Sequence, residues 1–331
     1  MLSFHLDRLW DSAEVTGLGP AAKSEGRQSL ERRTTEAIAR AMELFLEENE
    51  NTAEGCPECM TTVLYTHDGS IGDLAEGFED RRQLEGGVPF KSDRTSDTQN
   101  RSTRTEEWEM KKCSNLNILA HAWPLPTRPA GGGCSGVEVL IAGPGRSLPE
   151  AKHSSWLRDR RRLEYLKAQA GTQEVLLSET AGSSKGPFRR SLLEGLTSNF
   201  FVVEEDGAVC TAPSGVLEGA MRQLVLSVCE QDGIAFRFDA PDISRARYWR
   251  EAFLTGTGRI LAPVDALLIL DGEGSGETLD TIRNNNELPM SKIEVLQRGG
   301  EIDRQDSTHE LAEKLRARMV TELDKTATRL F

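Results

Sequence analysis

The sequence lacks any apolar run long enough to span a membrane, since a transmembrane helix needs about 20 consecutive apolar residues. Its first ten residues, MLSFHLDRLW, also lack the basic start and apolar core of a signal peptide. These two absences argue against an integral membrane protein and against a secreted one. We therefore expect a protein that resides in the cytoplasm and does not act at a membrane.

Basic residues and cysteines are both few. The 331 residues include 40 Lys and Arg against 53 Asp and Glu, which gives a net charge of −13. An acidic chain of this kind is not expected to bind nucleic acid. Six cysteines in a chain of this length do not form a disulfide framework, so a reducing compartment is expected. Hydrophobic residues, at 37%, suffice for a substantial core.

Several familiar site patterns are also absent. Cys56 and Cys59 form a lone C-x-x-C pair, and no second pair follows at a suitable spacing, whereas a zinc site needs about four ligands. The other possible ligands are scattered: Cys113, His121 and Cys134. The stretch DGEGSGE has Glu277 where a dinucleotide-binding loop needs its third glycine. No G-x-S-x-G motif or P-loop is present, so we expect no metal site and no nucleotide loop.

The first part of the chain predicts two helices followed by a sheet with a long insertion. Apolar residues at helical spacing predict helices over 2–15 and 29–48. The apolar runs predict strands at 60–65, 117–123 and 136–142. Residues 67–114 are rich in polar and charged residues and poor in apolar ones. Because such a segment cannot bury apolar area, we expect a disordered insertion there.

The second part of the chain follows a turn-rich stretch, GPGRSLPEAK, which we interpret as a hinge. Beyond it, short strands alternate with helices. Strands are expected at 174–178, 200–204, 234–238, 252–254, 259–261 and 266–270, helices at 217–230 and 307–326, and 292–295 is ambiguous. The mixture of elements with short strands does not fit one doubly wound sheet. It predicts a mixed α/β protein of the α+β class.

An amine, a carboxylate and two glycine-bearing turns follow one another in this second part. Lys152 and Glu194 supply the first two groups, and the turns are LEGAMR (217–222) and EAFLTGTGRILAPV (251–264). A lysine amine can form a Schiff base with an aldehyde cofactor, and a carboxylate can keep a pyridine nitrogen protonated. Backbone N–H groups at a helix start can hold a phosphate. Together these groups suit pyridoxal phosphate, although each alone is more often an ordinary surface or turn residue.

The segment 149–264 resembles the fold-type IV (class IV) pyridoxal-phosphate aminotransferases, which include branched-chain and D-amino-acid aminotransferases and aminodeoxychorismate lyase. FHLDRLW at the start is similar to the family's H-x-x-R-L segment. The resemblance implies that Lys152 is the catalytic Schiff-base lysine and that Glu194 binds the pyridine nitrogen. It further implies that Leu217 packs on the ring. The phosphate contacts that it implies are Arg8, Ala220, Met221 and Thr257.

The resemblance also implies an architecture. We expect a small α/β domain over 1–145, which includes the insertion, and a larger pseudo-barrel domain over 146–331 that binds the cofactor. Amino acids and 2-oxo acids would be the substrates, and the family implies a homodimer.

Three departures from the family pattern are visible. The family commonly has a tyrosine near O3′ of the cofactor, five positions after the lysine, where this chain has Leu157 beside Trp156. A tryptophan there is similar to a plant and algal branch labelled branched-chain-aminotransferase-like. The family's Gly-Ile-Thr-Arg turn is Gly-Ala-Met-Arg here. Family members also carry a further strand pair before H-x-x-R-L, so we expect a small domain truncated at its N-terminus.

Three functional hypotheses remain open from the sequence. The first is an aminotransferase that moves an amino group between an amino acid and a 2-oxo acid through a Lys152 Schiff base. The second is an elimination of the aminodeoxychorismate-lyase type with the same lysine. The third is a catalytically degenerate protein that keeps the fold, which the short N-terminus and the altered turn would favour.

Overall fold

The computed structural model describes residues 2–16, 18–49, 59–67, 116–124, 136–181, 189–270, 290–295 and 309–325. Its backbone contacts divide the chain into two compact units. Unit 1 comprises Met1–Arg8 and Leu125–Arg329, and unit 2 comprises Leu9–Pro124 with the last two residues. These units are not identical to the expected domains 1–145 and 146–331, which stay a prediction. The proposed insertion at 67–114 lies almost wholly outside the described residues.

Unit 2 packs helices against a two-stranded antiparallel sheet. Its elements are α1 (Leu2–Val15, of which the first residues belong to unit 1), α2 (Gly19–Glu25), α3 (Arg27–Asn49), β1 (Cys59–His67) and β2 (Leu116–Pro124). Ala13, Ala22, Leu30 and Leu116 form its buried core. The hydroxyls of Thr34, on α3, and Tyr65, on β1, form a hydrogen bond of 2.7 Å. The helices and strands expected in this part of the sequence are thus confirmed.

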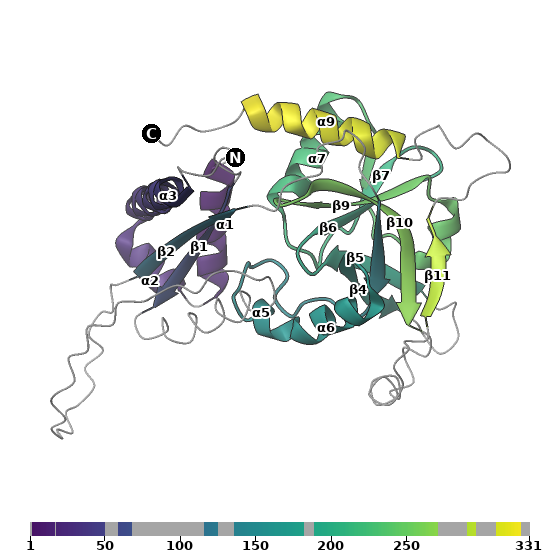
Figure 1. Cartoon of the computed structure of the whole chain (residues 1–331), viewed down its shortest axis with the longest axis horizontal. Helices are drawn as coiled ribbons and strands as arrows, with labels where there is room; N and C mark the ends of the chain where they lie inside the picture. The colour runs from purple at the N-terminus through teal and green to yellow at the C-terminus, as the bar shows by residue number, and fades with distance from the viewer. Residues whose placement is uncertain are drawn as a thin grey trace, which may run out of the picture. The chain divides into compact units, whose positions relative to one another are not determined.

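Unit 1 is built on a nine-stranded sheet that closes on itself (Figure 1). Its elements are β3 (Val137–Ile141), α5 (Trp156–Asp159), α6 (Arg161–Ala170), β4 (Glu174–Ala181), β5 (Arg189–Gly195), β6 (Asn199–Val203), β7 (Val209–Thr211), α7 (Ala220–Gln231), β8 (Phe236–Phe238), the 3₁₀ helix η1 (Ile243–Tyr248), β9 (Glu251–Gly256), β10 (Ile260–Leu270), β11 (Met290–Glu294) and α9 (Glu310–Lys325). The strand order is β11-β10-β3-β4-β5-β6-β7-β8, and β9 pairs with both β6 and β10. The circuit β10-β3-β4-β5-β6-β9 is therefore closed, which is the barrel-like arrangement that the resemblance implied.

The inside of this ring is filled by side chains from all six of its strands. They form one buried cluster that includes Val139, Ile141, Leu176, Leu192, Phe200, Val202, Leu254, Val264 and Leu267. Successive residues of a strand point to opposite faces, so the neighbours of these residues face outward. Phe201 and Phe253 stack there with ring centroids 5.1 Å apart, in a second core with α7 and α9. Because both faces are covered, the segment 200–203 of β6 is apolar throughout, as expected for a doubly buried strand.

Helix α9 is attached to the sheet through a buried carboxylate. Glu251, at the start of β9, accepts hydrogen bonds of 2.9 Å from the backbone N–H groups of Leu311 and Ala312. These N–H groups lie in the first turn of α9, where a helix has no internal partners for them. Glu251 therefore caps α9 and holds its apolar face on the sheet.

Most of the expected elements of unit 1 are confirmed, with three differences. Helix α7 begins at Ala220 rather than 217, because Leu217 to Gly219 form the turn that precedes it. The strands expected at 259–261 and 266–270 form one strand, β10, and the ambiguous 292–295 falls largely within β11. The sequence interpretation missed β5 and β7, which are short or begin with charged residues. Among the described residues, no helix is both long and apolar enough to cross a membrane.

Candidate cofactor site

The candidate site begins with a row of polar residues on three adjacent strands of unit 1. Glu194 of β5 pairs with Asn199 of β6, which pairs in turn with Thr255 of β9. All three side chains are buried, with 3%, 6% and 1% of their residues' surface exposed. Burial of a polar group costs free energy unless the group is hydrogen-bonded. Each of these side chains should therefore bond to another part of the protein or to a bound ligand.

The turn before α7 is fixed onto this row by two hydrogen bonds. The backbone N–H of Leu217 donates to Oε2 of Glu194 at 2.8 Å, and the Asn199 amide donates to the Leu217 carbonyl at 2.7 Å. Asn199 thus satisfies a backbone carbonyl of this turn. Gly219 forms the N-cap of α7, and a Cβ at this position would lie 2.2 Å from Oδ1 of Asn199. Only glycine lets the helix start approach the row so closely.

The start of α7 offers backbone donors for an anion. Gly219 provides no side-chain cap, and the first N–H groups of a helix have no partner within it. The side chains of Ala220 and Met221 are buried in the core, so their contribution to a ligand would come from the backbone. The loss of the family's threonine hydroxyl therefore leaves these donors intact. A helix of 12 residues with such a start suits a phosphate group.

The TGTGR stretch contains two threonines, of which Thr255 lies in β9 and pairs with Asn199. Thr257 is exposed on the turn between β9 and β10. Thr255 is missing from the sequence interpretation, and its buried hydroxyl has no hydrogen-bond partner among the described residues. Together with the glycine-dependent approach of α7, this unpartnered hydroxyl shows that the residues present fit a phosphate-bearing cofactor. A T-x-T repeat at the end of a strand was the signal that could have identified Thr255.

Lys152 lies in the loop between β3 and α5. Its side chain has an accessible surface, yet the amine is surrounded by enough protein to lose much of its hydration. This desolvation, followed by the charges of Arg8, Arg146 and Arg160, lowers the pKa of Lys152 to about 8. Such an amine is neutral far more often at neutral pH than that of an ordinary lysine. It is therefore suited to act as a nucleophile and a base.

The pKa of Glu194 is shifted upward, opposite to that of Lys152. Burial raises its pKa to about 7, against the hydrogen bond from Leu217 and the charge of Arg146, both of which lower it. The Arg146 guanidinium lies 3.4 Å from Oε1 of Glu194. Glu194 is thus a carboxylate whose ionisation responds to a neighbouring cation, as expected for a group that meets a protonated ring nitrogen.

The first residues of α1 belong to the same unit as Lys152, and they bring Arg8 and His5 to it. The charge of Arg8 contributes to the lowered pKa of Lys152. His5, whose ring nitrogen lies 3.3 Å from Arg8, was not singled out from the sequence. Its burial, and then the charges of Arg8 and Lys152, lower the pKa of His5 to about 4, so this ring is neutral at pH 7. Its place in the H-x-x-R-L segment, three residues before Arg8, was the available signal.

Trp156 does not present its N–H group to a ligand. Its indole Nε1 donates to the Leu196 carbonyl at 2.8 Å, and Leu157 beside it is 44% exposed. Neither residue thus takes the place of the family's tyrosine near O3′ of the cofactor. The tryptophan connects the lysine loop to the turn after Glu194 instead.

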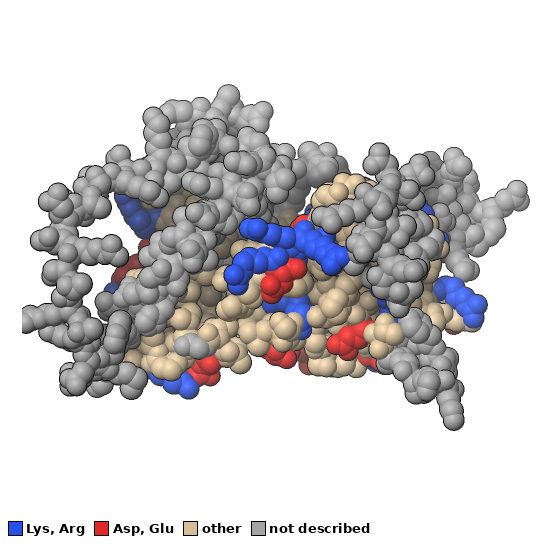
Figure 2. Space-filling view, turned by 90° about the horizontal axis from the view of Figure 1, so that it is seen from below, with Lys and Arg blue, Asp and Glu red and all other residues tan. Residues whose placement is uncertain are grey.

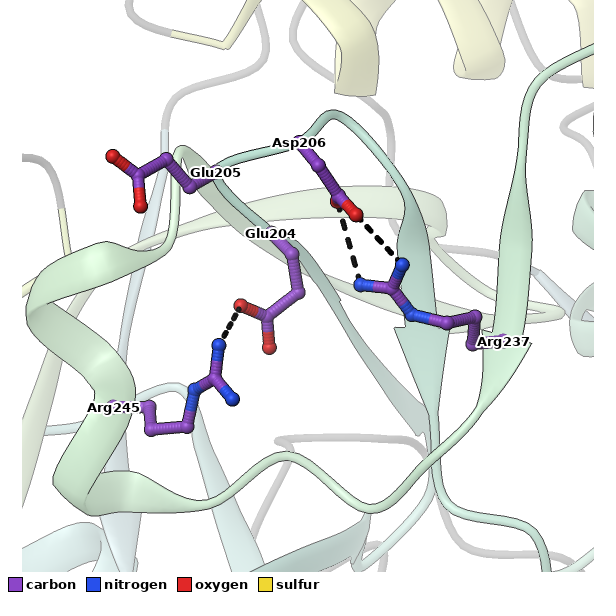
Figure 3. Close-up of a pocket in the computed structure, with 5 residues that line it drawn as sticks. All are labelled: Glu204, Glu205, Asp206, Arg237 and Arg245. Atoms are coloured by element: carbon purple, nitrogen blue, oxygen red, sulfur yellow. Dashed lines mark hydrogen bonds and ion pairs between the residues drawn. The ribbon is translucent and has the colours of Figure 1, made fainter.

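A hollow of about 370 Å³ lies at the other end of β6, beyond Val203. It is lined by Glu204, Glu205, Asp206, Arg237 and Arg245 (Figure 3). Arg237 pairs with Asp206 at 2.7 Å and Arg245 with Glu204 at 3.3 Å. The hollow is open, and its arginines are already paired with carboxylates. It contains none of the candidate cofactor groups, so we do not place the cofactor there.

The basic run 158–162 lies on α5 and α6, where Lys and Arg side chains gather on the face seen in Figure 2. Arg158, Arg161 and Arg162 are exposed, as expected for a solvated helix face. Arg160 is buried and donates to the Leu196 carbonyl at 3.3 Å. The described residues contain no cluster of three or more possible metal ligands, and Cys56 of the C-x-x-C pair lies outside them.

The sequence of residues 99–267 matches the family described as "Amino-transferase class IV". The chain belongs to the class IV aminotransferase family. The aminotransferases of this family transfer an amino group between an amino acid and a 2-oxo acid, and their cofactor is pyridoxal phosphate. The identification from the sequence is thereby confirmed, and the elimination alternative is not favoured.

Solved structures of other proteins share the fold of this class IV aminotransferase. A hypothetical aminotransferase from Mycobacterium tuberculosis in its PLP-bound form has a TM-score of 0.53 at 18% identity, over 96% of this chain and 83% of that one. Its form with α-ketoglutarate and PMP has a TM-score of 0.52 at 19% identity, with the same coverage. The fold IV transaminase CpuTA1 from Curtobacterium pusillum has a TM-score of 0.54 at 17% identity, over 98% of this chain and 80% of that one. No curated protein matches the sequence significantly.

Proposed function

We propose that Lys152 is the catalytic lysine of this aminotransferase and that Glu194 binds the pyridine nitrogen of its cofactor. The observation that carries this proposal is the shared environment of the two side chains. Arg146 contacts the Glu194 carboxylate and lowers the pKa of both groups. The remaining cofactor contacts would be Arg8, Leu217, Ala220, Met221 and Thr257, and Thr255 is a further candidate.

Each group has a task that its environment supports. Pyridoxal phosphate supplies an aldehyde for the amino group and an electron-withdrawing ring. The neutral amine of Lys152 would hold the cofactor through that aldehyde and would serve as the base that takes a proton from the substrate Cα. Glu194, when ionised, would hold the proton on the ring nitrogen. The α7 N-terminus and Arg8 would hold the phosphate through backbone donors and a guanidinium.

A visible absorption spectrum with added pyridoxal phosphate tests this proposal. We expect a band that borohydride abolishes by fixing the cofactor on the protein, and that Lys152→Ala does not form. Lys167→Ala is the matched control, because Lys167 lies on α6 and pairs with Glu164, away from the candidate cofactor groups. A band that persists in Lys152→Ala would contradict the assignment of the lysine. Mass spectrometry of the reduced protein would show the modified residue directly.

Turnover with pairs of amino acids and 2-oxo acids tests the reaction itself. We expect product only when a 2-oxo acid acceptor is present, since the amino group must be passed on. Product without an acceptor would indicate the elimination reaction. A protein that binds the cofactor but converts no pair would support the degenerate alternative.

A homodimer and a cytoplasmic location are part of this proposal. The family resemblance supports the homodimer, and sedimentation of the full chain with and without cofactor would test it. The cytoplasmic location is supported by the free buried thiols of Cys210 and Cys229, which a reducing compartment preserves. Localisation of a tagged chain would test it.

A further inference from the structure

Arg146 touches both sides of the candidate cofactor site. Its side chain is only 7% exposed, although it lies in the glycine- and proline-rich stretch after β3. One arm of its guanidinium lies 3.4 Å from Oε1 of Glu194. The other donates to the carbonyls of Ala151 at 2.6 Å and Leu148 at 3.3 Å. Ala151 is the residue directly before Lys152, so one side chain bonds the carboxylate and the backbone that carries the amine.

A second connection joins the same two segments. The Arg146 guanidinium lies over the ring of Trp156, 5.2 Å from its centroid. Trp156 in turn donates to the carbonyl of Leu196, two residues after Glu194. The lysine loop is therefore joined to the end of β5 at two points, one on Glu194 itself and one just beyond it.

The positive charge of Arg146 lowers the pKa of both Lys152 and Glu194, which favours a neutral amine and an ionised carboxylate. An arginine stays protonated at all pH values relevant to the protein. Its positive charge favours the ionised form of Glu194 and the uncharged form of Lys152. A neutral residue at this position would remove the cation that contacts the buried carboxylate and one of the three arginines that act on the amine.

We propose that Arg146 is a positioning residue of the cofactor site, which holds the Glu194 carboxylate and the backbone that carries Lys152 in one bonded unit and places one fixed positive charge beside both. This inference rests on the proposed function. It deepens that function, because Arg146 acts through Glu194 and Lys152 and not by contact with the substrate.

Substitution of Arg146 in the full chain tests this inference without any measurement of activity. In the cofactor-free protein, the Glu194 carboxyl carbon can be followed by ¹³C NMR, with its resonance assigned by its loss in Glu194→Gln. Reductive methylation with ¹³C-formaldehyde gives the titration midpoint of Lys152, assigned with Lys152→Ala. In Arg146→Met we expect both midpoints to rise, that of Glu194 by about one pH unit, because a cation in contact with a carboxylate shifts its pKa by about that amount or more.

Three further variants separate positioning from mere folding. Arg146→Lys should restore much of the shift at Lys152 but less at Glu194, because an ammonium cannot reach the carboxylate and two carbonyls in one fork. Arg160→Met should raise the midpoint of Lys152 and change that of Glu194 less, since Arg160 acts on the lysine, whereas Arg146 contacts the carboxylate. Arg237→Met removes an arginine at the other end of β6 and should change neither midpoint. Should Arg146→Met fail to fold, Arg146→Gln provides the same test with a polar side chain.

A folded Arg146 variant in which both midpoints stay at their wild-type values would overturn the inference, even if its melting temperature falls. A midpoint that moves for only one of the two groups would overturn the claim that one residue controls both. These outcomes are distinguishable from a failure of the proposed function. That failure is the absence of a borohydride-sensitive band in the wild-type protein, whereas the titrations are made before any cofactor is added.

Discussion

The carboxylate of Glu194 accepts a hydrogen bond of 2.8 Å from the backbone N–H of Leu217. The two residues are 23 positions apart, and the bond fixes the turn before α7 to the end of β5. It thereby brings the carboxylate next to a helix start that can hold a phosphate. The group proposed to bind the ring nitrogen of the cofactor and the backbone proposed to bind its phosphate are therefore held together by one hydrogen bond.

Replacement of Glu194 by glutamine should stabilise the cofactor-free protein above pH 7. The raised pKa of Glu194 means that the folded state keeps the proton up to about pH 7, whereas the unfolded state releases it near 4.5. The free energy of unfolding therefore falls as pH rises between these values. Glutamine avoids this loss, which is on the order of 3 kcal/mol at pH 8 since one pKa unit corresponds to about 1.4 kcal/mol. Urea denaturation at pH 5 and pH 8 checks this.

The control for that experiment is Glu230→Gln, a substitution of an exposed glutamate on α7. It should change stability by the same small amount at both pH values. A Glu194→Gln protein that is less stable than the wild type at pH 8 would show that the ionised carboxylate is favoured by its partners.

The rate of covalent cofactor capture should rise with pH and level off above about 8. Only the neutral amine of Lys152 reacts, and its lowered pKa of about 8 makes most of it neutral beyond that point. An ordinary lysine, with a pKa near 10.4, would show a rise that continues for about two further pH units. Stopped-flow absorbance between pH 6.5 and 10 measures the rate. Lysine acetylated on its α-amino group, with a free side-chain amine, serves in the same buffers as the reference for the titration of the cofactor itself. A rate that still climbs at pH 10 would refute the lowered pKa.

Trp156→Phe should weaken the fold but leave the titration of the bound cofactor unchanged. The substitution removes the hydrogen bond to the Leu196 carbonyl and leaves that buried acceptor with one partner fewer, at a cost of about 1–2 kcal/mol. It keeps a ring for the Arg146 guanidinium. Urea denaturation and the pH dependence of the cofactor band measure the two effects. Tyr165→Phe, on an exposed residue of α6, is the control. A shift of the band's midpoint in Trp156→Phe would mean that the indole reaches the cofactor.

Gly219→Ala should lower the affinity for pyridoxal phosphate more than that for pyridoxal. The added Cβ would lie 2.2 Å from Oδ1 of Asn199, so either the amide or the start of α7 must move. Either movement disturbs the backbone donors for the phosphate and costs about 1–3 kcal/mol of stability by overpacking. Gly258→Ala, where nothing lies within 4 Å of the added atom, is the control for stability. Equal losses of affinity for both ligands would argue against a phosphate at the α7 N-terminus.

Much of the candidate site could be proposed from the sequence, because its signals are local. Lys152, Glu194 and the glycine-bearing turns follow one another in an order and spacing that the chain itself displays. The apolar residues of the stretch 200–204 predicted a buried strand, and helical periodicity predicted α1 and α3. These features depend on neighbouring residues, so a linear sequence contains them.

The tertiary structure decided what depends on residues distant in sequence. No pattern indicated that β9 would pair with both β6 and β10 and so close the ring. In the sequence, Arg146 is one charged residue in a turn-rich stretch. Only the fold brings it next to Glu194, 48 residues later. The sequence determined which chemical groups were available. The closed sheet decided which of them share an environment, because burial and charge act through space, and the pKa values of Lys152 and Glu194 arise only there.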